Sequence, residues 1–109
     1  MKLLKSIVRP NKVDEVKDAL AKLNIAGMTV TEVRVHGKQK GHTAIYRGKE
    51  YNVSLLPKME IEVVVSDSIA DEAIKAIVQA ARTGEIGDGR VFVLPVAESY
   101  KIRTGEMES

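Results

Sequence analysis

The same order of hydrophobic patterns occurs twice in this chain of 109 residues, and this repeat restricts the fold more than any other feature. In each half, a short segment rich in Val, Ile and Leu precedes a segment with apolar side chains at helical spacing, and a second strand-like segment follows. Short apolar or alternating segments indicate strands, whereas apolar residues three to four positions apart indicate amphipathic helices. The expected elements are strands at 2–9, 28–35, 58–66 and 90–95, and helices at 11–24 and 67–81.

The strand–helix–strand order of both halves predicts an α+β fold of the ferredoxin-like type. In this βαββαβ sandwich, one antiparallel sheet carries both helices on the same face. Residues 1–109 are expected to form a single domain, because a chain of this length supports one modest core. The helices and the sheet face that they cover would supply that core.

The third predicted strand indicates that the second face of the sheet also carries an apolar side chain. Ile61, Val63 and Val65 belong to one face of the strand, whereas Glu62 and Val64 belong to the other. Too little chain remains to cover this second face, so we expect it to pack against another subunit.

The segment between the two halves has no regular hydrophobic period. Residues 36–57 are therefore expected to form a long loop, and loops of about twenty residues in a compact domain are usually functional or disordered. A hairpin is the alternative, because residues 44–46 and 51–53 flank Gly48 and could pair with each other. Either arrangement is compatible with a surface that contacts a partner.

A glycine-rich stretch, residues 82–90, lies between the second helical pattern and the last strand pattern. Gly87 and Gly89 flank Asp88, and glycine tolerates positive φ and lets the backbone come close to a ligand. Backbone amides next to Arg90 would suit an anion, most simply a phosphate. The alternative is an ordinary glycine-rich connection with solvated arginines. The residues alone leave both interpretations of 82–90 open.

The C-terminal tail, residues 96–109, is expected to be largely irregular, with mobile last residues. Only residues 100–103 have an extended pattern. Lys101 and Arg103 lie in this part of the tail and could add positive charge to a phosphate site.

The composition excludes several classes of function. The chain has no cysteine, which excludes disulfides, thiolate metal sites and a cysteine nucleophile and agrees with a cytoplasmic protein. Seventeen basic residues nearly balance fifteen acidic ones, and no basic run is interleaved with aromatic residues, so direct nucleic-acid binding is not expected. The sequence contains no recognisable signal peptide or membrane span. We therefore expect contact with a membrane only through a partner protein.

Residues 83–92, Thr-Gly-Glu-Ile-Gly-Asp-Gly-Arg-Val-Phe, resemble the nucleotide-binding loop of the P-II family of nitrogen-regulatory signalling proteins. Several independent motifs in the right order are more specific than one motif. The other segments that resemble this family, in order along the chain, are 7–10, 27–31, 37–42, 46–51, 56–58 and 102–106. On this resemblance the chain is identified as a member of the P-II family.

The resemblance implies a homotrimer that binds ATP or ADP in a cleft between neighbouring subunits. Residues 82–90 of one subunit would form a phosphate-binding loop and hold the phosphates together with basic residues from the tail of its neighbour. Strand residues would line the adenine and ribose side. The positions that match the family's nucleotide site are Thr29, Gly37, Lys38, Glu62, Val64, Gly87, Asp88, Gly89, Arg90, Lys101, Ile102 and Arg103.

The resemblance also implies a 2-oxoglutarate site at the base of the long loop. In the family, a glutamine at the position of Gln39 helps to ligate Mg²⁺ beside ATP, and 2-oxoglutarate chelates that metal. Lys58 would then neutralise the charge of the effector, and Lys40 and Gly41 match the rest of the site. Tyr51 matches the tyrosine that many P-II proteins carry for uridylylation or adenylylation.

The expected function is regulatory rather than enzymatic. Residues 36–57 would dock on nitrogen-metabolism enzymes, regulators or an ammonium transporter and report the bound effectors. One alternative is a P-II-like paralogue that regulates carbon metabolism or transport with the same nucleotide cleft. A slow ATPase or a nucleotidyl-transfer protein is another, although no recognisable base or nucleophile constellation is present.

Some positions depart from the family. Residues 34–36, Arg-Val-His, replace a common Gly-Phe pair, and Arg90 and Lys101 exchange the lysine and arginine often found there. Because Arg and Lys hold phosphate differently, these changes could alter the preference for ATP or ADP. His36 and His42 match no standard metal-ligand spacing, so we expect no histidine metal site.

Overall fold

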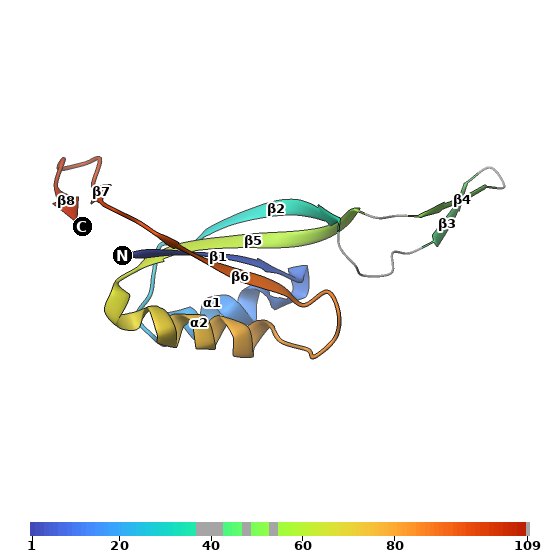
Figure 1. Cartoon of the computed structure of the whole chain (residues 1–109), viewed down its shortest axis with the longest axis horizontal. Coiled ribbons are helices and arrows are strands. Elements are labelled where there is room, and N and C mark those ends of the chain that lie inside the picture. The colour runs from blue at the N-terminus through green and yellow to red at the C-terminus, as the bar shows by residue number, and fades with distance from the viewer. Residues whose placement is uncertain (37–42, 47–48, 53–54, 109) are drawn as a thin grey trace.

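A computed structural model of the chain describes residues 1–36, 43–46, 49–52 and 55–108 (Figure 1). Two helices, a short 3-10 helix and eight strands make up the described part. In chain order they are β1 (Lys2–Val8), η1 (Pro10–Lys12), α1 (Val13–Ala21), β2 (Thr29–His36), β3 (Thr43–Tyr46), β4 (Lys49–Asn52), β5 (Leu55–Val65), α2 (Asp67–Ala81), β6 (Gly89–Pro95), β7 (Ser99–Tyr100) and β8 (Met107–Glu108).

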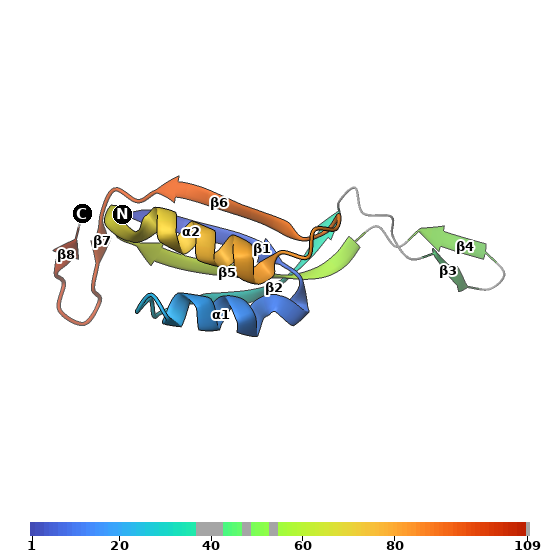
Figure 2. The same cartoon turned by 90° about the horizontal axis from the view of Figure 1, so that it is seen from below.

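The main sheet has the strand order β2-β5-β1-β6, and every neighbouring pair is antiparallel. Both helices lie side by side on one face of this sheet (Figures 1 and 2). The predicted ferredoxin-like α+β fold is therefore confirmed. Neither helix of the described chain has the length and apolar character that a membrane crossing requires.

The core lies between the helices and the sheet face that they cover. In the sheet, Leu4 lies opposite Val63 and Ser6 lies opposite Ile61, and all four side chains are buried. The helices fill the other side of the core with buried Val, Leu, Ala and Ile side chains. The small residues of α2 have a packing role, because a helix face rich in alanine can approach the sheet closely. The buried side of α2 consists of Ala70, Ala73, Ile77 and Ala81.

The other face of the sheet is open in the single chain. Val64, Phe92 and Leu94 are between 41% and 48% exposed, and strand register places them on the same face. The two faces of β5 thus alternate as predicted. An open row of large apolar side chains is typical of a surface that another protein covers.

Three predicted boundaries need correction. The segment expected to be a loop over 36–57 is shorter, because β2 continues through His36 and β5 begins at Leu55. Pairing between these two strands extends to His36 opposite Leu55, so backbone hydrogen bonding continues after the clear hydrophobic alternation has ended. The helix expected over 11–24 has its α-helical part at Val13–Ala21, because Pro10 begins a separate 3-10 turn.

The hairpin alternative for the central segment is confirmed. Strands β3 and β4 pair in antiparallel register, with Thr43 opposite Asn52 and Tyr46 opposite Lys49. The tail also contains a hairpin, because β7 pairs with β8. The extended pattern expected over 100–103 was wrong after Tyr100, since the chain turns there and Gly105 adopts a positive φ of 74°.

Ile77 offers a test of the core. Its side chain is fully buried, so Ile77→Ala should leave a cavity and lower the free energy of unfolding by about 2–5 kcal/mol. Ile86→Ala makes the same chemical change at a side chain that is 74% exposed and should cost much less. Urea unfolding at one fixed protein concentration measures both effects. Equal losses in the two variants would contradict the described core.

Candidate functional site

The connection from α2 to β6 is folded around the carboxylate of Asp88. This carboxylate accepts hydrogen bonds from the backbone amides of Thr83 and Gly84, both at 2.8 Å, and from the Thr83 hydroxyl. The start and end of the connection are therefore tied together by one side chain. We call residues 82–89 the glycine loop.

Two basic side chains hold the glycine loop from the strands below it. Arg9 follows β1, and its guanidinium donates to an Asp88 carboxylate oxygen at 3.2 Å and to the carbonyl oxygen of Ile86 at 3.0 Å. Lys58 lies in β5, and its ammonium donates to the carbonyl oxygen of Gly87 at 2.8 Å. Residues distant in sequence thus fix three oxygen-bearing groups of the loop.

Gly89 brings the loop into contact with β1. Its φ is +103°, and a Cβ atom built there would lie 1.7 Å from the carbonyl oxygen of Ile7. Because that oxygen belongs to the backbone of a central strand, it cannot move aside easily. Only glycine fits this position, so the sequence motif has a direct steric cause.

The contacts within the loop shift two pKa values in different ways. Hydrogen bonds from the side chain and backbone of Thr83, with help from Gly84 and Arg9, hold the pKa of the Asp88 carboxyl well below its ordinary value of 3.8. Burial, together with the nearby charge of Arg9, lowers the pKa of Lys58, and the carboxylate of Asp88 opposes this effect. Asp88 is therefore ionised wherever the protein is folded at ordinary pH.

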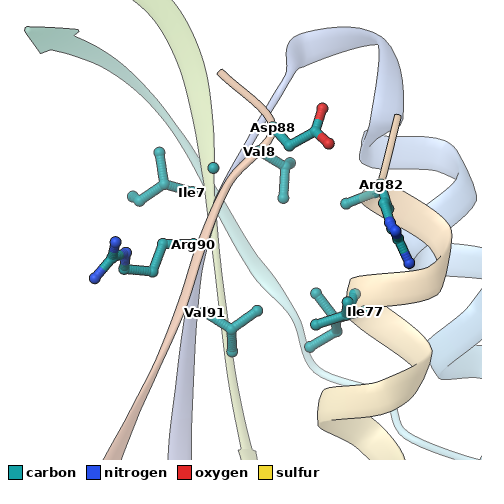
Figure 3. Close-up of a pocket in the computed structure, with 10 residues that line it drawn as sticks. Ile7, Val8, Ile77, Arg82, Asp88, Arg90 and Val91 are labelled. Atoms are coloured by element: carbon teal, nitrogen blue, oxygen red, sulfur yellow. The ribbon is translucent and has the colours of Figure 1, made fainter. Parts of the chain in front are cut away.

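A small apolar cavity of about 120 Å³ lies beside the loop, between α2 and β6. Figure 3 shows Val91 and Ile77 facing each other there, whereas Ile7 and Arg90 point to the opposite side of the strand. The cavity is therefore on the helix side of the sheet. Arg90 instead belongs to the open face, the side on which an anion could approach without crossing the core.

Comparison with known proteins identifies the family. The profile of the family "Nitrogen regulatory protein P-II" matches residues 1–106. A nitrogen regulatory protein P-II from Azospirillum brasilense is 58% identical over 106 residues, covering 97% of this chain and 95% of the relative. The chain belongs to the nitrogen regulatory protein P-II family.

Other P-II relatives agree over the same length. The protein from Rhizobium etli is 51% identical over 109 residues, covering 100% of this chain and 97% of the relative. The nitrogen regulatory protein P-II 1 of Escherichia coli strain K12 is 54% identical over 106 residues, with 97% and 95% covered. The similarity therefore extends over the whole sandwich rather than one motif.

The sheet brings several of the expected nucleotide residues onto one face. Thr29 lies directly opposite Glu62 in the pairing of β2 with β5, and Val64 is two residues along the same face of β5. Arg90 shares the open face and lies two strand spacings, about 10 Å, across the sheet from Glu60, which is two residues before Glu62 on β5. Strand residues and glycine loop thus border one continuous surface.

The basic residues of the tail lie at the opposite end of the sandwich from the glycine loop. The length of β6, about 20 Å, separates the glycine loop from the β7–β8 hairpin (Figure 1). Lys101, Ile102 and Arg103 belong to this hairpin, and Ile102 is fully exposed. One chain therefore does not bring the tail residues to its own glycine loop.

The residues expected to bind 2-oxoglutarate are only partly described. Lys58 lies beneath the glycine loop, as given above. Tyr51 is in β4, and its modification stays a prediction. No cluster of three His, Asp or Glu side chains suited to a metal occurs within 1–36, 43–46, 49–52 and 55–108. Gly37, Lys38, Gln39, Lys40 and Gly41 lie outside the described residues.

Sequence reasoning missed the structural roles of Arg9 and Thr83. Both lie in segments that resemble the family, but neither was assigned to a site. A basic residue directly after a strand, followed by Pro10, was the available signal for Arg9. The role predicted for Asp88 was also incomplete. Its carboxylate accepts hydrogen bonds from the amides of Thr83 and Gly84 and so organises the loop itself.

The low pKa of Asp88 predicts a pH-dependent contribution to stability. Since the folded-state pKa lies below the unfolded value, the ionised carboxylate stabilises the fold above about pH 4. This contribution should fall as the pH drops below that value and be lost below the folded-state pKa. Urea unfolding of the wild type and Asp88→Asn should show the wild-type advantage at pH 7 shrinking toward pH 2. Parallel pH profiles would contradict the prediction.

Proposed function

We propose that this P-II protein is a cytoplasmic signal-transduction protein that binds ATP and ADP at the glycine loop. The observation that carries the proposal is that three oxygen-bearing groups of the loop already accept hydrogen bonds from donors of this chain. Arg9, Lys58 and Thr83 bind the carbonyl or carboxylate oxygens of Ile86, Gly87 and Asp88. These oxygens are thereby neutralised and would oppose an incoming phosphate less.

Arg90 and the open sheet face provide the rest of the proposed site within one chain. Arg90 would bind phosphate, and Thr29, Glu62 and Val64 would line the adenine and ribose side with Gly37 and Lys38. The common face of these strand residues supports this assignment. Gly87, Asp88 and Gly89 would contribute the loop backbone.

A neighbouring subunit would complete the site. Lys101, Ile102 and Arg103 are too far from the glycine loop of their own chain, so their proposed role requires the loop of another copy. The open row formed by Val64, Phe92 and Leu94 supports such packing. We propose the homotrimer because it would cover this face and would also place the tail of one subunit beside the glycine loop of the next.

The effector proposed for the base of the long loop is 2-oxoglutarate. Lys58 and Arg9 lie near each other beneath the glycine loop, and a dianionic effector there would meet two cationic side chains. Gln39, Lys40 and Gly41 would complete the site, and Gln39 would help to hold Mg²⁺. When bound, Mg²⁺ supplies open positions for oxygen ligands, which a 2-oxo acid can chelate.

The bound effectors would be reported through residues 36–57. This segment contains the β3–β4 hairpin, which projects from the end of the sandwich (Figure 1). Its proposed targets are nitrogen-metabolism enzymes, regulators or an ammonium transporter. Nucleotidylation of Tyr51 in this hairpin would add bulk and negative charge and would block docking.

Nucleotide binding can be tested with a tail variant. Arg103→Ala should weaken both ATP and ADP by about 1–3 kcal/mol, the effect of losing a hydrogen bond to a charged group. Lys75→Ala, an exposed change on α2, is the control and should bind both nucleotides like the wild type. Isothermal titration calorimetry measures the affinities. Unchanged binding in Arg103→Ala would remove Arg103 from the site.

Subunit sharing has its own test within the same experiment. Mixed trimers of Arg90→Ala and Arg103→Ala chains should contain some sites with both arginines intact, because loop and tail come from different copies. Such mixtures should recover tight ADP sites that neither variant has alone. No recovery in confirmed mixed trimers would contradict the shared cleft.

Effector binding gives a further prediction. 2-Oxoglutarate should bind with Mg-ATP and only weakly with ADP, since ADP lacks the γ-phosphate that helps to hold the metal. Coupling is reciprocal, so 2-oxoglutarate should tighten ATP by the same factor. Calorimetry with Gln39→Ala should show a large loss of effector binding. Equal binding with ATP, with ADP and without Mg²⁺ would contradict this mechanism.

A further inference from the structure

The open face of the sheet carries a charged cluster beside its apolar row. Lys5 lies on β1, and its ammonium is 3.8 Å from a carboxylate oxygen of Glu60 on β5. Strand register also places Lys5 directly opposite Glu62 on β5 and Phe92 on β6. One cation therefore lies beside two carboxylates and next to a large exposed apolar side chain.

Lys5 occupies the middle of the face that the proposed homotrimer covers. Its strand β1 lies between β5 and β6, and these two strands carry the exposed side chains Val64, Phe92 and Leu94. A neighbouring subunit that packs on the apolar side chains of both strands must also cover β1 between them. The Lys5 side chain, which is 41% exposed in the single chain, would then lose most of its contact with water.

Covering Lys5 makes the charges of this cluster important for assembly. A charged group that is removed from water is costly unless it is paired and hydrogen-bonded. The 3.8 Å between Lys5 and Glu60 is longer than a charge-assisted hydrogen bond of about 2.7–2.9 Å, so the pair within one chain is loose. In a cyclic assembly every subunit presents the same face, and each copy therefore brings the same carboxylates to the interface.

We infer that Lys5 and Glu60 form charge pairs between copies of this chain and thereby restrict assembly to chains that carry these charges. The inference rests on the proposed homotrimer and adds to it the kind of chain that can enter it. A chain with the same fold but another charge at position 5 or 60 would place like charges together or leave one charge unpaired. Such a chain would be rejected even if its apolar row fitted equally well.

A charge swap tests this inference, because it keeps the net charge and still allows a pair within one chain. The double variant Lys5→Glu/Glu60→Lys should form trimers with itself, since its own pairs are restored. Co-expressed with the wild type, it should give mixed trimers at about one fifth of the statistical share or less, because like charges would face each other. Native mass spectrometry of the two chains, one of them carrying a mass tag, counts each composition.

The ion pair between Lys12 and Glu15 provides the matched control. Its charged atoms are 3.3 Å apart at the start of α1, in the helix layer that covers the other face of the sheet. Lys12→Glu/Glu15→Lys makes the same exchange of charges away from the open face. This variant should therefore form mixed trimers with the wild type in the statistical proportion.

A second variant decides the question if the swapped protein does not assemble. Lys5→Met/Glu60→Gln removes both charges at similar side-chain length and should form trimers with itself. Its mixed trimers with the wild type should again be fewer than the statistical share, because each mixed contact leaves a wild-type charge unpaired.

The outcomes separate this inference from the proposed function. Statistical mixing of the wild type with the swapped variant, or with the charge-free variant where the swapped one does not assemble, would overturn this inference alone. Failure of both variants to form trimers with themselves would also overturn it, since each is expected to do so. A wild type that stays monomeric would overturn the proposed homotrimer as well.

Discussion

The close approach of Gly89 to β1 is the constraint on which the candidate site depends. The backbone at Gly89 passes so near the carbonyl of Ile7 that no side chain fits between them. This contact lets β6 begin in register with Val8 and leaves the glycine loop directly above the end of β1. Arg9 follows that strand end at once, so the same contact puts its guanidinium within reach of Asp88. One steric fact thus fixes both the last strand and the electrostatics of the loop.

The basic side chains around the glycine loop donate hydrogen bonds to its carbonyl and carboxylate oxygens. Arg9 and Lys58 are both basic, and the carboxylate of Asp88 pairs with Arg9 and raises the pKa of Lys58 through its charge. Asp88 is further engaged by amides of its own loop, which spread its charge over several donors. These contacts hold the loop from its own amides and from the strands below it.

Sequence patterns predicted the architecture because hydrophobic periods report burial directly. The alternation at Ile61, Val63 and Val65 fixed the covered face, and the glycines marked the loop correctly. The patterns offered the β3–β4 hairpin only as an alternative, and they missed the extension of β2 to His36, where pairing with Leu55 continues after the alternation ends. They also could not assign Arg9, since its contacts join residues 77 to 79 positions apart. The nucleotide and effector residues came from resemblance, and their binding roles remain predictions.

The positions of loop and tail give a physical reason why a single P-II chain would be an incomplete site. β6 pairs with β1 along its whole length, so the glycine loop before it and the hairpin after it lie at opposite ends of the sheet (Figure 1). No local rearrangement of a seven-residue strand can bring Arg103 back to Gly87 of the same chain. In a cyclic assembly, however, the tail end of one copy can meet the loop end of the next through the same interface at each step. That arrangement would bury the apolar row at Val64 and Phe92 and would bring the basic residues of the tail to the proposed phosphate site. The uncovered sheet face and the divided basic residues would then have one common explanation.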